Sequence, residues 1–296
     1  MLVVGSANLD LVFRSDRLPI PGETILGRGF ETYPGGKGAN QAVAVGRLGG
    51  EVAFSGCLGS DAFGDELRAH LQAAGVRVDF VARVPVPSGT AGILVGAAGM
   101  NMIVVAPGAN ALVTEAQVAK ALAECNPSVT LCQLEIPMNA VREASRATRF
   151  VLNPAPAAAV PDEILKRCYV LTPNESELQS LTGIEPVDLE SCGRAARMLL
   201  DRGVQNVVVT LGARGSYWES AQGGCHFPAP PVNAIDTTAA GDAFNGALAM
   251  FLAEGRPLED AIPLANCVGA LSATKPGAQS SMPTREELLA FAGHLV

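Results

Sequence analysis

The feature that most constrains the fold is a regular alternation of strand-like and helix-like segments between Thr114 and Val209. Four short apolar runs predict strands over 128–133, 150–153, 169–173 and 206–210, and amphipathic runs between them predict helices. Such alternation is typical of a parallel sheet with right-handed crossovers, in which ligands bind at the carboxyl ends of the strands. No G-x-G-x-x-G fingerprint follows these strands, which argues against a dinucleotide-dependent dehydrogenase.

The N-terminal segment combines a buried strand with two polar residues. Met1 to Gly5 is apolar and predicts a first buried strand. Residues two apart on an extended chain face the same side, so Asn8 and Asp10 are expected to point the same way. Two short polar side chains on one face suit a pair of hydroxyl groups. An exposed loop at a strand end explains them equally well.

Two further segments predict a small appended sheet. Residues 18–30 are rich in Pro and Gly, which predicts a turn with short strands outside the main core. Residues 88–95 and 102–105 predict a hairpin around a turn at 96–99. Because apolar residues occupy both faces, we expect the hairpin to close over a substrate and to contact a second copy of the chain. The alternative is that these are core strands of a single sheet.

Composition limits the classes of protein to which the chain can belong. A hydrophobic fraction of 48% and a charged fraction of 17% over 296 residues exclude a disordered chain and allow one large domain or two average ones. The net charge of -8 argues against binding to nucleic acid or to an anionic membrane. Seven cysteines without a C-x-x-C pair, no histidine at zinc spacing from them, and no leader or membrane-length apolar run predict a cytoplasmic protein without zinc.

The stretch from Asp236 to Gly246, D-T-T-A-A-G-D-A-F-N-G, carries the chemistry. The apolar run after it predicts a helix whose first turn is Ala239-Ala240-Gly241, with unpaired N–H groups and a helix dipole that favour an anion such as phosphate. Asp242 lies in the same turn, and we interpret it as a general base directed at a hydroxyl nucleophile. For a lone Asp, simple stabilisation of the helix N-terminus is the favoured alternative.

This stretch resembles the catalytic signature of the ribokinase family of small-molecule kinases, D-T-x-G/A-A-G-D. The resemblance implies that Asp242 is the catalytic base and that Ala239, Ala240 and Gly241 form the anion hole. Ala239 stands where many members have Gly, and because Ala tolerates helical geometry we expect this departure to matter little. The resemblance extends from Gly5 to nearly the C-terminus, with the motifs in the family's order.

A second motif, G-G-K-G-A-N at 35–40, resembles the family's sugar loop. A Walker phosphate loop is excluded because it needs Gly at Glu31 and Ser or Thr at Gly38. Many fructokinases have Ala in place of Lys37, so the local signal leans to ribose. A strand-end residue such as Glu135 is also explained by simple solvation. The resemblance assigns to the sugar Asn8, Asp10, Gly36, Lys37, Gly38, Asn40, Glu135 and Asp242.

The resemblance also implies an ATP site that contains Mg²⁺. The N-x-x-E motif of Asn174 and Glu177 would organise the ion through water, although on spacing alone it is a helix N-cap with acids in the first turn. Asn266 lies on an apolar helix, where a satisfied core polar group is the alternative. The nucleotide loop T-L-G-x-x-G matches 210–215. The implied ATP-binding residues are Asn174, Thr210, Leu211, Gly212, Ala213, Arg214, Gly215, Gly241 and Asn266.

A monovalent cation, K⁺, is the last element that the resemblance implies. Carbonyl and carboxylate oxygens suit a hard cation. The implied ligands are Asp236, Thr238, Ser272, Lys275 through its carbonyl, Gly277 and Ser281.

These observations predict a ribokinase-like α/β three-layer sandwich with a mainly parallel central sheet and a small β-sheet lid. We expect a single kinase domain over 1–296, with the lid formed by about 9–33 and 89–106, and a homodimer through the lid. The predicted activity is transfer of the γ-phosphoryl group of ATP to the primary hydroxyl of a pentose, D-ribose first, with Mg²⁺ and K⁺. Alternatives are a 2-deoxyribose, fructose or nucleoside kinase of the same family, or a non-catalytic sugar-binding regulator. The presence of Asp242, the expected catalytic base, argues against the regulator.

Overall fold

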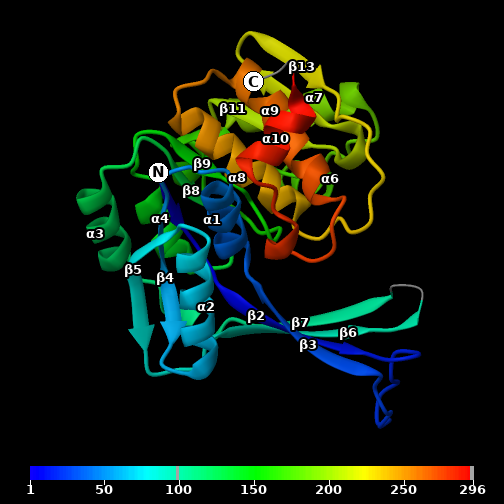
Figure 1. The fold of residues 1–296 in the computed structure, drawn as a ribbon. Coiled ribbons are helices and arrows are strands. Elements are labelled where there is room, and N and C mark those ends of the chain that lie inside the picture. The colour runs from blue at the N-terminus through cyan, green and yellow to red at the C-terminus, as the bar shows by residue number, and fades with distance from the viewer. Residues whose placement is uncertain (98–99, 294–296) are drawn as a thin grey trace.

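A computed structural model describes residues 1–97 and 100–293, which form two sheets (Figure 1). Within this part, the larger sheet has nine strands in the order β13-β12-β11-β10-β9-β8-β1-β4-β5. Neighbours from β11 to β5 run parallel, and β12 and β13 are antiparallel additions at one edge. The bounds are β1 Leu2–Val4, β4 Ala53–Gly59, β5 Arg77–Val84, β8 Thr130–Cys132, β9 Phe150–Leu152, β10 Cys168–Leu171, β11 Asn206–Thr210, β12 Ser216–Ser220 and β13 Gly223–Phe227.

Helices cover both faces of this sheet, because successive strand side chains point to opposite sides. Val3 and Val151 belong to one core, whereas Leu2 and Leu152 belong to the other. The first core is covered by α1 Lys37–Arg47, α2 Ala62–Ala73, α8 Ala240–Ala253, α9 Leu258–Ser272 and α10 Arg285–Ala292. The second is covered by α3 Glu115–Cys125, α4 Met138–Ala144, α5 Asp162–Leu165, α6 Glu175–Thr182 and α7 Leu189–Asp201. The predicted three-layer architecture is therefore confirmed.

The smaller sheet has the order β3-β2-β6-β7 and extends away from the main body (Figure 1). Its strands are β2 Asn8–Arg14, β3 Gly29–Gly35, β6 Gly89–Val95 and β7 Asn101–Ala106. β6 and β7 pair antiparallel, as expected for a hairpin, and β6 pairs parallel with β2. The alternative that these strands belong to the central sheet is wrong. Of the turn predicted at 96–99, residues 98 and 99 lie outside the described residues.

Helix α1 begins earlier than the helical run that the sequence indicates at 43–48. It starts at Lys37, directly after Gly36, whose φ of +85° turns the chain out of β3. A Cβ at Gly36 would lie 2.7 Å from the backbone nitrogen of Asn8, so only glycine fits there. The close contact is with the chain's own backbone, which local propensity does not reveal.

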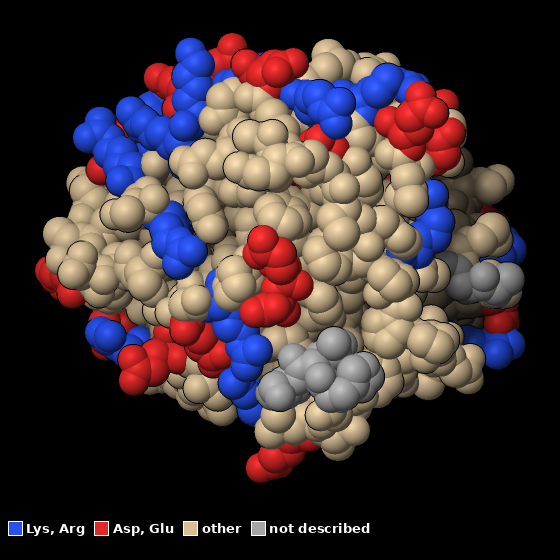
Figure 2. Space-filling model, turned by 90° about the horizontal axis from the view of Figure 1, so that it is seen from above, with Lys and Arg blue, Asp and Glu red and all other residues tan. Residues whose placement is uncertain are grey.

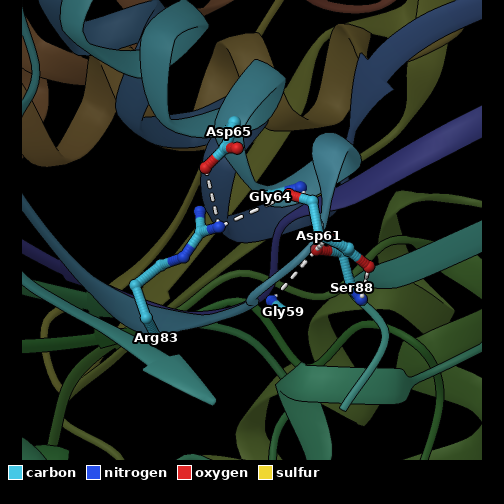
Figure 3. A network of polar contacts seen from close by, with 6 residues as sticks. All are labelled: Gly59, Asp61, Gly64, Asp65, Arg83 and Ser88. Carbon is cyan, nitrogen blue, oxygen red and sulfur yellow. Dashed lines mark hydrogen bonds and ion pairs between the residues drawn. The ribbon is translucent and has the colours of Figure 1, made fainter. Parts of the chain in front are cut away.

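A polar network joins the smaller sheet to the main body (Figure 3). Asp61 caps α2 by accepting the N–H of Gly64 at 2.8 Å, and it also accepts the N–H and O–H of Ser88 at 2.8 and 2.6 Å. The N–H of Gly59 donates to Ser88 Oγ at 3.0 Å. Because Ser88 precedes the first residue of β6, the network fixes the start of that strand against β4 and α2.

The surface has charges of both signs on the face that Figure 2 shows. Seen from above, acidic and basic side chains lie interspersed, with wide uncharged areas between them (Figure 2). In the described part of the chain, no helix combines the length and apolar character needed to cross a membrane.

Candidate active site

The site lies at the carboxyl edge of the central sheet, as expected for parallel strands. A cavity of about 850 Å³ opens between the first turn of α8, the start of α6 and the end of β11. Of the residues predicted for the sugar, Lys37 and Asp242 line this cavity, and Asn8 and Asp10 belong to β2 of the smaller sheet. The sequence-predicted residues on the cavity wall are Lys37, Asn174, Glu177, Thr210, Gly212, Ala213, Gly215, Ala239, Ala240, Gly241, Asp242 and Asn266.

Asp242 is the central side chain of the site. It lies in the first turn of α8 and is only 7% exposed. Asn40 Nδ2 donates to its Oδ2 and Gln41 Nε2 donates to its Oδ1, each at 2.9 Å. Both oxygens therefore accept hydrogen bonds from α1 rather than from the backbone of α8. Stabilisation of the helix N-terminus alone does not explain this arrangement.

Burial and nearby charges shift the pKa values of Asp242 and Lys37 in opposite directions. Burial raises the pKa of Asp242, and the charge of Lys37 with the two amide hydrogen bonds partly offsets that rise. Burial favours the neutral form of Lys37, but the carboxylates of Asp242, Glu135 and Glu177 outweigh it and raise the pKa of Lys37. Lys37 is therefore a cation at neutral pH, and it stabilises the ionised form of Asp242.

The sugar-side residues converge on Glu135 and on the start of β2. Glu135 Oε2 accepts the hydroxyl of Ser6 at 2.5 Å and the backbone N–H of Lys37 at 3.0 Å. Asp10 packs so closely on Gly35 that a Cβ there would lie 2.5 Å from Asp10 Oδ2. Burial and the nearby charge of Glu135 raise the pKa of Asp10 to about 7. The structure thus brings the two carboxylates close enough to influence each other.

The expectation for Ala239 is wrong. It has a φ of +60° and a ψ of 11°, in the left-handed region, and α8 begins only at Ala240. A left-handed conformation costs a residue with a Cβ ~1–2 kcal/mol, which is why glycine suits this position. The N–H of Ala240 donates to the carbonyl of Thr237 at 3.2 Å, while those of Ala239 and Gly241 have no acceptor within the described residues. Of the three N–H groups predicted to be unpaired, that of Ala240 is therefore already engaged.

Two of the predicted nucleotide residues, Leu211 and Arg214, do not line the cavity. Leu211 is buried in the core, so it can meet a ligand only through its backbone. The guanidinium of Arg214 pairs with Glu175, a residue on the cavity wall. Asn266 lines the cavity and donates to the carbonyl of Phe227 at 3.1 Å, so it is both a satisfied polar group and a wall residue.

Asn174 and Glu177 form a reciprocal capping box at α6. Asn174 Oδ1 accepts the N–H of Glu177 at 2.8 Å, and Glu177 Oε2 accepts the N–H of Asn174 at 2.9 Å. The N-cap interpretation is therefore confirmed. In the described residues no three His, Cys, Asp or Glu side chains gather to hold a metal. Mg²⁺ usually keeps several waters and needs only one or two protein carboxylates, so buried Glu177 on the cavity wall fits such an ion.

Asp236 accepts a hydrogen bond from each of the two segments predicted to hold K⁺. Its Oδ1 accepts the N–H of Thr238 and its Oδ2 accepts the N–H of Gly277, both at 2.9 Å. The buried hydroxyl of Ser272 has no hydrogen-bond partner in the described part of the chain. An orphaned hydroxyl near backbone carbonyls suits a hard cation, so the residues fit this ion. Ser281 Oγ donates to Ala278 O at 2.7 Å, and the ammonium of Lys275 pairs with Glu287 at 2.5 Å.

Several residues of the candidate site were not predicted from the sequence. Gln41 holds Asp242 and also donates to Asn153 Oδ1 at 3.1 Å. Asn153 directly follows β9, so its place after a parallel strand was a usable signal. Gln279 donates to Asn40, and no local pattern indicates this contact. An apolar wall over 229–232 likewise carries no motif.

Comparison with known proteins gives one consistent result. The model of the pfkB family of carbohydrate kinases matches residues 1–285. A ribokinase of Haemophilus influenzae is 40% identical over 99% of this chain and 98% of its own. A deoxyribokinase of Salmonella typhimurium is 36% identical over 96% of each chain. The structure of Arabidopsis thaliana ribokinase complexed with ribose and ATP matches with a TM-score of 0.90 and 32% identity, covering 98% of this chain and 97% of that one.

Proposed function

Because the chain belongs to the pfkB family of carbohydrate kinases, we propose that it transfers the γ-phosphoryl group of ATP to the primary hydroxyl of D-ribose. The observation that carries the proposal is the position of Asp242. Its carboxylate is held by Asn40 and Gln41 on the wall of a cavity that also contains the N-terminus of α8. A base beside an anion-binding helix turn is the arrangement that phosphoryl transfer to a hydroxyl needs.

In the proposed reaction, Asp242 accepts the proton of the primary hydroxyl as that oxygen attacks the γ-phosphorus. A new O–P bond forms and the bond between the γ-phosphorus and the bridging oxygen of ADP breaks. The proton then leaves Asp242 for solvent. The raised pKa of Asp242 makes it a better proton acceptor than an ordinary carboxylate.

Charge stabilisation comes from groups around the transferred phosphoryl. The free N–H of Gly241 and the dipole of α8 face the cavity, and Lys37 adds a positive charge on its wall. Bound Mg²⁺ would neutralise the phosphate charge, with Asn174 and Glu177 holding its waters. K⁺ would be held by Asp236, Thr238, Ser272, Lys275, Gly277 and Ser281.

The smaller sheet is proposed to act as a lid and as a dimer contact. Its outer strand β7 exposes a run of apolar side chains, with Val104 74% exposed, and Phe13 and Phe30 of β2 and β3 are also exposed. Such a patch on a monomer favours burial against a second copy. All seven cysteines are free, which supports a reducing, cytoplasmic location.

A panel of acceptors with ATP, followed by product identification, tests the function. We expect ribose 5-phosphate, and a kcat/KM for ribose at least about tenfold above that for 2-deoxyribose, since a missing hydroxyl leaves a buried polar group unpaired. The similarity to a deoxyribokinase makes 2-deoxyribose the second candidate. A better rate with 2-deoxyribose would overturn the choice of ribose but not the kinase. Transfer to no acceptor would favour a sugar-binding regulator.

A further inference from the structure

A buried amide lies behind the proposed sugar-contacting residue Asn8. Asn110, in the 3-10 helix Gly108–Leu112, is 1% exposed and does not line the cavity. Its Nδ2 donates to Asn8 Oδ1 at 2.7 Å. Asn110 is therefore buried against the side chain of Asn8 and is not part of the cavity wall.

The orientation of the Asn110 amide is fixed by the backbone of Ala7. Asn110 Oδ1 accepts the N–H of Ala7 at 3.0 Å, and Nδ2 also donates to the carbonyl of Ala7 at 3.2 Å. If the amide were flipped, its NH₂ group would face the N–H of Ala7 and its oxygen would face the carbonyl oxygen of Ala7. Because a buried unpaired polar group is costly, Asn110 is held in one orientation.

The orientation of Asn8 follows from that of Asn110. Asn8 Oδ1 is engaged as an acceptor, so the free end of the amide is the Nδ2 donor, which has no acceptor within the described residues. Asn8 and Asp10 lie on the same face of β2. A ligand at this face therefore meets one amide donor beside one carboxylate acceptor.

The pair has little room to rearrange. Gly89 is the partner of Asn8 in β6, and a Cβ at Gly89 would lie 2.2 Å from Asn110 Nδ2 and 2.3 Å from Asn8 Oδ1. The residue before Gly89 is Ser88, which Asp61 and Gly59 clamp to the main body (Figure 3). The segment that packs against Asn8 and Asn110 is thus held in place by residues outside the smaller sheet.

We propose that Asn110 is a specificity-determining positioning residue, which fixes the Asn8 amide so that its donor end faces the sugar. The inference rests on the proposed function, because it takes Asn8 as a sugar contact. It requires a hydroxyl oxygen that accepts from Asn8 next to a hydroxyl that donates to Asp10. A sugar without the hydroxyl that accepts from Asn8 leaves the fixed donor unpaired.

The substitution Asn110→Asp tests this directly. A carboxylate can still accept the N–H of Ala7, but it cannot donate to Asn8, so Asn8 must turn its Nδ2 inward and present Oδ1 beside Asp10. We expect kcat/KM for ribose to fall by about 10–100-fold, mainly through KM, while 2-deoxyribose changes less than about threefold. The exposed Asn126→Asp makes the same charge change and serves as the control.

A double-mutant cycle with Asn8→Ala separates positioning from a general structural effect. If Asn110 acts through Asn8, then Asn110→Asp adds almost nothing in the Asn8→Ala background. Equal losses for both sugars, or losses that add to those of Asn8→Ala, would overturn the inference. If Asn110→Asp does not fold, the uncharged Asn110→Ser is put through the same cycle. A wild-type protein without pentose kinase activity would instead overturn the proposed function.

Discussion

Gln279 Nε2 donates a hydrogen bond to Asn40 Oδ1 at 3.0 Å, across 239 positions of the chain. Asn40 in turn donates through Nδ2 to Asp242 Oδ2 at 2.9 Å. Gln279 belongs to the 3-10 turn Gln279–Ser281, which follows the Gly277 amide bound by Asp236. Two side chains, Gln279 and Asn40, thus connect the proposed cation loop with the proposed base.

Replacement of Gln279 by Met should lower kcat by about 3–10-fold with little loss of stability. The Oε1 of Gln279 has no partner in the described part of the chain, so the substitution removes an orphaned acceptor together with one hydrogen bond. Asn40 then loses the contact that holds it toward Asp242. Steady-state kinetics and urea unfolding measure the two effects, with exposed Gln222→Met as control. Unchanged kcat would show that the connection has no catalytic role.

Asp242→Asn should lower turnover by about 10²–10⁴-fold, the usual contribution of a positioned base. Ribose and ATP should still bind, which calorimetry can measure. The new amide must turn one N–H₂ end toward a donor, Asn40 or Gln41, so we also expect a lower thermal stability. An Asn variant with near-normal turnover would contradict the assignment of the base.

Asp10 should make the protein less stable as pH rises from about 4 to about 7. Its pKa in the folded chain is raised to about 7 from its ordinary value of 3.8, so the folded state binds the proton more tightly and loses that advantage as pH rises. Asp10→Asn should remove this slope, worth roughly 1–3 kcal/mol. Denaturant unfolding at pH 4 and pH 8 measures it. Exposed Asp201→Asn is the control, and an equal pH slope in wild type and Asp10→Asn would contradict the prediction.

Ala239→Gly should stabilise the protein by about 0.5–1 kcal/mol. Glycine relieves the left-handed strain at this position, and the relief exceeds its larger loss of chain entropy. The matched control is Ala249→Gly in the buried interior of α8, where the same substitution should destabilise. Thermal and denaturant unfolding give both values, and a less stable Ala239→Gly would count against the strain.

Potassium should raise activity and also raise the melting temperature without substrates, if it binds between Asp236 and the segment 275–281. The proposed site is one for K⁺, so Na⁺ and Li⁺ should be less effective. Asp236→Asn should abolish the difference between the salts. Equal activity and equal melting temperature in all three salts would remove the site.

The sequence predicted the sheet and the position of Asp242 because both depend on local periodicity. β8 to β11 lie within two residues of the apolar runs, and the apolar run after Gly246 predicts a helix with Asp242 in its first turn. What could not be predicted depends on distant contacts. Gln41 contacts Asp242 across 201 positions of the sequence, and Asn110 contacts Asn8 across 102 positions. Neither contact produces a periodic pattern in the sequence from which it could be predicted. The left-handed Ala239 likewise depends on the surrounding fold rather than on helix propensity.

The residues proposed to bind the sugar and those proposed to bind the nucleotide come from different parts of the sequence. The proposed sugar contacts other than Asp242 come from the first 135 residues, whereas the proposed nucleotide contacts begin at Asn174. In the central sheet, the N-terminal strands β1, β4 and β5 lie together at one end, and the strands from β9 onward lie at the other. Mutation or recombination in the first half can therefore change the acceptor while the phosphate donor machinery is inherited intact. A chimaera joined after Glu135 should exchange acceptor preference between two members of the family and leave the use of ATP as it was.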